Sequence, residues 1–138
     1  MIDNIYQLNF LLSKAFNSVI LNHQEISSIE NTHLINFGSH TQTHQRLSNT
    51  VEQNILENEI IDSKNNLVDL THKYLDIFCF PNGDTCLKAE KLVKKHYNGA
   101  CTTQKGVNHP DCDHYKLKRF NFHNGNSGSN RRFFSALL

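Results

Sequence analysis

Several features that separate broad classes of protein are missing from this sequence. Tryptophan is absent, and 14 basic residues against 13 acidic ones leave a formal net charge of only +1. Such a balance gives no electrostatic reason to expect a nucleic-acid or membrane-surface partner. No apolar run approaches the ~20 residues that a helix needs to cross a bilayer, so the sequence predicts no membrane span.

A recognisable signal peptide is missing as well. Asp3 stands where a basic region is expected, and Asn9, Lys14 and Asn17 interrupt the apolar stretch that should follow it. We therefore expect a chain that is not marked for export, although the sequence leaves its compartment open.

The cysteines do not form the knuckles of a zinc finger. Four of them occur, at positions 79, 86, 101 and 112, and no two are separated by only two residues. Without a sign of export, free thiols are expected rather than disulfides. One alternative stays open, in which Cys101, Cys112 and nearby histidines of segment 101–114 form a Cys/His metal-binding module.

What is present suits one domain, 1–138, of the α/β class. The 138 residues are 38% hydrophobic, which is enough for a single core. Hydrophobic spacing and turn signals predict helices alternating with strands, an order typical of βαβ units and a mainly parallel sheet. The helices are expected at 3–21, 23–31, 51–62, 85–96 and the last eight residues, with one more helical turn at 67–73, and the strands at 34–37, 75–80, 100–103 and 115–122.

Local signals set the expected ends of these elements. Thr50 followed by Gln53 matches a capping box, and Asn65 with Asn66 is expected to end that helix. Gly38 is expected to stop the first strand. In the helix at 85–96, the periodicity places Leu87 inward, together with Leu92 and Val93.

Two histidines four residues apart follow the first strand. His40 and His44 would share one face of a helical turn, close enough to hold one metal ion. The spacing alone is a weak signal, because nine histidines in this length make such a pair common by chance. The position of the pair directly after a strand strengthens the signal, since parallel α/β folds build their sites at the carboxyl ends of strands.

A second motif ends the next strand. The segment 78–83 reads Phe-Cys-Phe-Pro-Asn-Gly, in which Pro81 and Gly83 predict a sharp turn. At minimum this is a strand that ends in a turn. A turn fixed by proline can also aim a backbone N–H into a site, where it stabilises an oxyanion. We expect the turn and His40 to lie on the same edge of the sheet.

Taken together, these motifs resemble the polysaccharide deacetylase family, also called the NodB-homology domain or carbohydrate esterase family 4. Residues 38–48, GSHTQTHQRLS, are similar to its second motif, and residues 78–83 are similar to the third motif of one branch. Segments 89–95, 100–103 and 117–120 also look like that branch. The resemblance covers about residues 24–138.

The resemblance implies a distorted (β/α) barrel and a metal-dependent hydrolase that removes N-acetyl groups from a sugar polymer. The divalent metal, commonly zinc, would be bound by His40 and His44. Pro81 and Asn82 would contact substrate, and the backbone N–H of Asn82 would face the developing oxyanion. Members of this family often act at the cell envelope.

One departure from the family pattern limits these expectations. The Asp-Asp motif, which supplies the base and a third metal ligand, has no counterpart, since no Asp-Asp pair occurs in the chain. We therefore expect a partial barrel that lacks its first strands, with an unpaired edge beside Phe37, low stability and impaired activity. The alternative is a non-catalytic remnant that binds carbohydrate or a protein partner.

Overall fold

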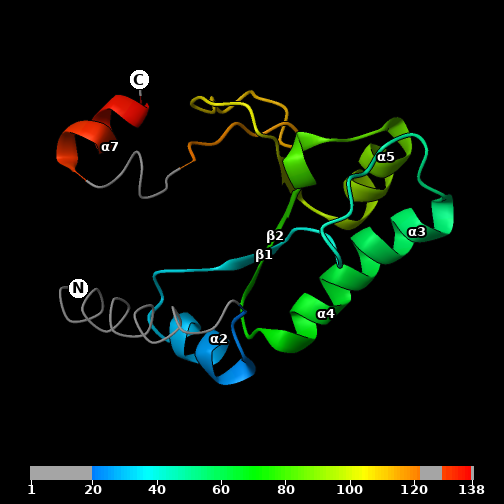
Figure 1. Cartoon of the computed structure of the whole chain (residues 1–138), viewed down its shortest axis with the longest axis horizontal. Coiled ribbons are helices and arrows are strands. Elements are labelled where there is room, and N and C mark those ends of the chain that lie inside the picture. Colours follow the sequence, from blue (N-terminus) through cyan, green and yellow to red (C-terminus); the bar gives the residue numbers. More distant parts are fainter. Residues whose placement is uncertain (1–19, 122–128, 138) are drawn as a thin grey trace.

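The computed structural model describes residues 20–121 and 129–137 (Figure 1). Within them a parallel sheet of three strands has the order β1-β2-β3. The strands are β1 (Phe37–Ser39), β2 (Tyr74–Cys79) and β3 (Gly99–Cys101). The helices are α2 (His23–Glu30), α3 (Gln53–Glu57), the π-helix η1 (Asn58–Asp62), α4 (Ser63–Leu70), the 3₁₀ turn η2 (Pro81–Gly83), α5 (Leu87–His96) and α7 (Asn130–Leu137).

The expected alternation of helices and parallel strands is confirmed, and the predicted strands that differ most from the structure are the first and the last. Segment 115–122 was expected as a fourth strand, but its described part forms only an isolated bridge between Leu117 and Cys101. Leu117 bonds with Ala100 and Thr102, and the chain then turns so that Arg119 N–H donates to the Gln104 carbonyl. In the described residues the sheet is open, with β1 at one edge, so the barrel stays a prediction.

The helix expected over 51–62 is longer than its local signals indicate. Its N-cap is Glu52, without a side-chain cap, so the predicted capping box at Thr50 is wrong. Asn65 and Asn66 do not end it, because the helical run continues through η1 and α4 to Leu70. Packing overrides the weak helix propensity of asparagine here. In Figure 1 this run lies along one side of the sheet, next to α5.

The remaining helices follow their sequence signals more closely. The helix expected at 23–31 is confirmed as α2, which begins at a capping box between Asn22 and Glu25. The helices at 85–96 and at the C-terminus are confirmed as α5 and α7. Leu87, however, is 74% exposed and not inward. The helix expected at 3–21 lies almost wholly outside the described residues.

Gly38 does not stop the first strand but lies inside β1. A Cβ atom at this position would be 3.0 Å from the backbone oxygen of Ile77 in β2, so glycine permits the close approach of the two strands. The strand expected at 34–37 therefore shares only Phe37 with β1, because residues 34–36 lie outside the strand and β1 runs on to Ser39, where the chain leaves the sheet.

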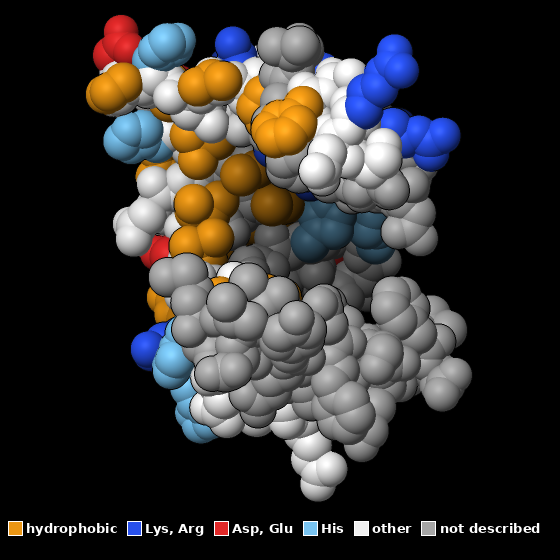
Figure 2. Space-filling model, turned by 90° about the vertical axis from the view of Figure 1, so that its left-hand side faces the viewer, with side chains coloured by type: hydrophobic (Ala, Val, Ile, Leu, Met, Phe, Trp, Pro, Cys, Tyr) orange, Lys and Arg blue, Asp and Glu red, His pale blue; other side chains and the backbone are white. Residues whose placement is uncertain are grey.

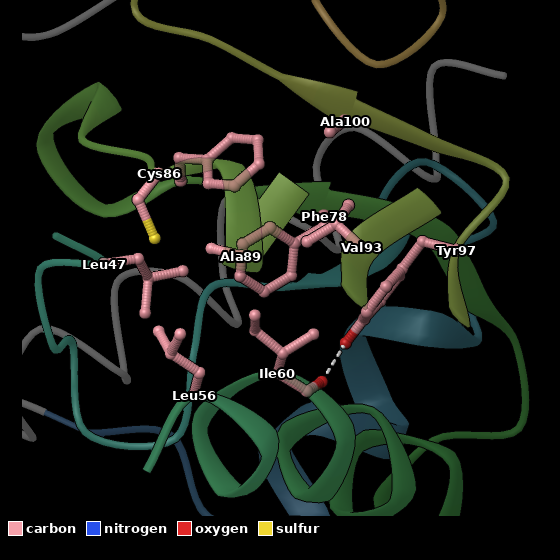
Figure 3. Close-up of a cluster of buried hydrophobic side chains, with 10 residues drawn as sticks. Leu47, Leu56, Ile60, Phe78, Cys86, Ala89, Val93, Tyr97 and Ala100 are labelled. Atoms are coloured by element: carbon pink, nitrogen blue, oxygen red, sulfur yellow. Dashed lines mark hydrogen bonds between the residues drawn. The ribbon is translucent and has the colours of Figure 1, made fainter. Parts of the chain in front are cut away.

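A hydrophobic core fills the space between the sheet and the helices (Figure 3). Phe78 of β2 is fully buried, and its ring packs at 5.1 Å from Phe80 and 5.2 Å from Tyr97, measured between ring centroids. The core also contains Leu47, Leu56, Ile60, Cys86, Ala89, Val93 and Ala100. Among the described residues, no helix is long and apolar enough to span a bilayer.

Buried hydroxyl groups join this core to the π-helix. The Tyr97 hydroxyl donates to the Ile60 carbonyl at 2.7 Å, as Figure 3 shows, and Ser63 Oγ donates to the same carbonyl at 3.0 Å. Ser63 Oγ is also 2.7 Å from Ser39 Oγ at the end of β1. Burial raises the pKa of Tyr97, which keeps its hydroxyl protonated as a donor. The network therefore ties β1 to the helical run.

We expect Tyr97→Phe to lower the free energy of unfolding by about 1 kcal/mol, because it removes a buried hydrogen bond to Ile60. Tyr74→Phe is the matched control, since Tyr74 is 37% exposed and its change should stay within about 0.5 kcal/mol. Urea unfolding of both variants checks this. Equal losses in the two variants would contradict the role given to the Tyr97 hydroxyl.

Candidate functional site

His40 is the first residue after β1, and a single hydrogen bond fixes its ring. Its Nδ1 lies 2.7 Å from the backbone carbonyl oxygen of Cys79, the last residue of β2. A carbonyl can only accept, so Nδ1 carries the proton in this bond. In the neutral ring, the lone pair is then on Nε2, which is the arrangement of a metal-ligating histidine with its second nitrogen bonded to the protein.

His44 lies beside His40, although not in the way that the spacing suggested. The segment between them is a loop and not a helical turn, with positive φ angles at Thr41 (69°) and His44 (62°). The ring centroids are nevertheless 4.9 Å apart, with an angle of 74° between the ring planes. Two imidazoles bound to one zinc ion through ~2.1 Å bonds have centroids about 5 Å apart, so the pair fits two positions of a metal site.

The donor set of such a site is incomplete in the part of the chain that the structure describes. No group of three or more His, Cys, Asp or Glu side chains that could hold a metal ion occurs among those residues. This includes segment 101–114, where a Cys/His module was considered. His40 and His44 therefore account for two ligands, and the described residues add no third one.

The loop between the two histidines is held by a buried carboxylate. Glu59 of η1 is 6% exposed, and its Oε2 accepts the backbone N–H groups of Gln42 and Thr43, both at 2.9 Å. Its Oε1 accepts the Thr43 hydroxyl at 2.6 Å. These three bonds fix the loop conformation that brings His44 back to His40.

Sequence reasoning missed Glu59. A signal was present, because Glu59 follows the buried Leu56 by three residues and precedes Ile60 on the same apolar stripe of the helix. An acidic residue in such a stripe needs buried hydrogen-bond partners. Its location in a π-helix is a second signal of function, since single π turns occur frequently at functional sites, but only the structure reveals it.

The Pro81–Gly83 turn lies on the same edge of the sheet as His40. Only Phe80 separates it from the end of β2, and β2 is the parallel neighbour of β1. Asn82 has φ 55°, and its backbone N–H has no hydrogen-bond acceptor among the described residues. Gly83 has φ 77°, and a Cβ there would lie 2.4 Å from Thr103 Oγ1. The turn thus presents an N–H without an acceptor among the described residues, in a conformation that few residues other than glycine and asparagine adopt.

A polar pocket of about 460 Å³ adjoins both motifs along the chain. Its lining includes the ion pair between Arg46 and Asp84, whose hydrogen bond raises the pKa of Arg46 and lowers the pKa of Asp84. The lining residues carry mostly hydroxyl, amide and charged groups, and they are Gln45, Arg46, Ser48, Asn49, Thr50, Val51, Asp84 and Thr85.

Figure 2 shows histidine side chains inside a hollow on one face of the molecule.

Two thiols lie at the same edge of the sheet. Cys79 and Cys101 are paired in register between β2 and β3, and both are partly exposed and free. Hydrogen bonding from Cys101 lowers the pKa of the Cys79 thiol to about 7, against the effect of burial and with help from the charge of Arg119. The same interaction raises the pKa of Cys101.

The sequence profile described as polysaccharide deacetylase matches residues 6–101. Two solved structures align with 86% of this chain at a TM-score of 0.68, a polysaccharide deacetylase from Bacillus cereus (27% identical) and a candidate one from Bacillus anthracis (26% identical). The Streptococcus pyogenes deacetylase PplD, solved in complex with acetate, aligns with 92% at a TM-score of 0.73, but at 16% identity it shows likeness of fold alone. This chain spans 37% of each Bacillus chain and 55% of the streptococcal one. No curated protein matches it.

We expect Glu59→Gln to lower the free energy of unfolding by about 2 kcal/mol, because an amide replaces a charged acceptor of three hydrogen bonds. Glu57→Gln is the matched control, since Glu57 is exposed on the same helical run. Imidazole NMR signals of His40 and His44 should shift in the Glu59 variant and stay unchanged in the control. Unchanged signals in both would contradict the role of Glu59 in holding the loop.

Proposed function

The chain belongs to the polysaccharide deacetylase family, and from this premise we propose that it hydrolyses N-acetyl groups of a sugar polymer. The reaction consumes water and converts an acetamide into acetate and a free amine. The observation that supports the proposal best is the pairing of the His40 and His44 rings at 4.9 Å, on the same edge of the sheet as the turn that contains Asn82.

His40 and His44 are proposed as ligands of a divalent metal, zinc in the first place. When bound, such an ion supplies Lewis acidity, which polarises the amide carbonyl and makes water more acidic. The chain presents the His40 imidazole in the right tautomer through the bond from Nδ1–H to the Cys79 carbonyl. The hydrogen bonds from the loop to Glu59 set the position of His44.

The Pro81–Gly83 turn is proposed to stabilise the charge that develops on the amide oxygen. Pro81 has no N–H and fixes the start of the turn, and Asn82 then offers its backbone N–H without a competing acceptor among the described residues. A donor that is held in place before the reaction costs no reorganisation when the charge forms.

The neighbouring polar pocket is proposed to bind sugar hydroxyl groups. Its lining combines hydroxyl and amide side chains with the Arg46–Asp84 pair, which offers donors and acceptors side by side. Its volume of about 460 Å³ falls in the range of small-molecule sites, about 300–1,000 Å³. An N-acetylated oligosaccharide is therefore the proposed ligand, with its acetamide directed to the histidine pair.

Slow turnover is part of the proposal. No carboxylate completes a metal site with the histidine pair in the described part of the chain, and the sequence has no Asp-Asp pair of the kind that would supply the base for the attacking water. General-base catalysis contributes typically 10²–10⁴-fold to rate, and its absence would reduce activity by about that factor. Binding of carbohydrate without catalysis is the second candidate, and the same missing base favours it.

We expect the chain to bind zinc and to release acetate slowly from N-acetylglucosamine oligomers, and we expect His40→Ala to abolish both. His109→Ala is the control, because His109 is exposed in the loop after β3 and should leave both unchanged. Calorimetric zinc titration and an acetate assay measure the two effects.

Arg46→Ala should raise KM and leave zinc affinity unchanged, since Arg46 lines only the pocket.

The outcomes separate the candidates. Zinc and sugar binding without acetate release would favour the non-catalytic candidate over the hydrolase. Zinc binding that survives His40→Ala would contradict the proposed ligand pair, and acetate release that survives it would contradict the proposed mechanism.

A further inference from the structure

Cys79 and Cys101 occupy directly opposed positions on neighbouring parallel strands. Their Cα atoms are register partners, one position beyond the pair formed by Phe78 and Ala100. Because side chains alternate along a strand, the two thiols share one face of the sheet, and the buried Phe78 and Ala100 share the other. The cysteines therefore point away from the core, on the same side as each other.

The spacing of these positions suits a disulfide. Neighbouring strands lie about 4.7–4.9 Å apart, and the Cα atoms of disulfide-bonded cysteines are usually about 4.4–6.8 Å apart. No large backbone movement is therefore needed to join the two sulfur atoms. Both residues are free and only partly buried, so a small reagent can reach them.

The other two cysteines lack these features. Cys86 is 5% exposed and packs in the hydrophobic core, where a reagent has little access. Cys112 is more exposed but lies in the loop after β3, and no strand places another cysteine opposite it. The chain thus contains one geometrically matched pair and two internal controls.

We propose that Cys79 and Cys101 form a reversible disulfide by exchange with a low-molecular-weight disulfide such as oxidised glutathione. This modification is independent of the deacetylase function and does not need a metal. The thiolate of one cysteine attacks a sulfur of the small disulfide, forms a mixed disulfide and releases one thiolate, which takes up a proton. The second cysteine gives up its proton, attacks the mixed disulfide and releases a second thiol. One small disulfide is reduced to two thiols, and the two protein thiols are oxidised to one disulfide.

The bond would link the ends of β2 and β3 at the edge that carries the histidine pair. Cys79 already accepts a hydrogen bond from His40 through its carbonyl oxygen, and Cys101 directly precedes the segment whose Thr103 packs under Gly83. Oxidation would thus join two segments that support the site, without using any side chain of the proposed metal pair.

The test is oxidation of the full chain with glutathione mixtures, followed by intact mass measurement and peptide mapping. We expect a loss of two hydrogen atoms, a cross-link between Cys79 and Cys101, and full reversal by a reductant. Cys112→Ser should leave the cross-link unchanged. Cys101→Ser should trap one glutathione on Cys79, with a circular dichroism spectrum that matches the parent chain.

Three results would overturn the proposal. They are glutathione adducts on the parent chain that never resolve to the internal bond, a cross-link that involves Cys86 or Cys112, and a cross-link only between two copies of the chain. Because the mapping is done on the parent chain, a folding defect in either variant does not affect this decision.

Discussion

The carboxylate of Glu59 is the interaction on which the rest of the site depends. Three donors of the loop after β1 converge on it, two of them backbone N–H groups. These bonds hold the loop in which the positive φ angles of Thr41 and His44 turn the chain so that the two imidazoles meet. Strained backbone of this kind persists only where the surroundings over-determine it.

The π-helix gives Glu59 its position, and the core fixes the π-helix. The Ile60 carbonyl accepts the hydroxyl groups of Tyr97 and Ser63. Ser63 also reaches Ser39 at the end of β1, so the same helical run contacts the strand before the loop and the loop itself. The geometry at the sheet edge is thus supported from the interior by buried polar side chains, and among the described residues each buried side-chain N or O atom has a hydrogen-bond partner.

Sequence patterns predicted the layout of the fold well, because hydrophobic period and turn chemistry are local signals. The parallel order, α2, α5, and the turn at Pro81 all follow from such signals. Errors occurred where tertiary packing decided the outcome. Asn65 and Asn66 stay helical within the long helical run, and the described part of segment 115–122 fails as a strand because its hydrogen bonds go to a loop after Leu117.

The candidate site was predicted in part for the same reason. His40 and His44 were found by spacing and position, and their proximity is observed, but the loop conformation behind it was not predicted. Glu59 lies 15 residues along the chain from His44, and only folding brings them together. Likewise, the pairing of Cys79 with Cys101 requires a strand register that residue spacing does not specify.

The most direct measurement is an anomalous difference map from crystals of the chain grown with zinc. The account predicts one peak bonded to His40 and His44, with the Glu59 carboxylate still accepting the N–H groups of Gln42 and Thr43. An ion bonded to Glu59 itself, or to histidines elsewhere with the His40 and His44 rings apart, would contradict the account.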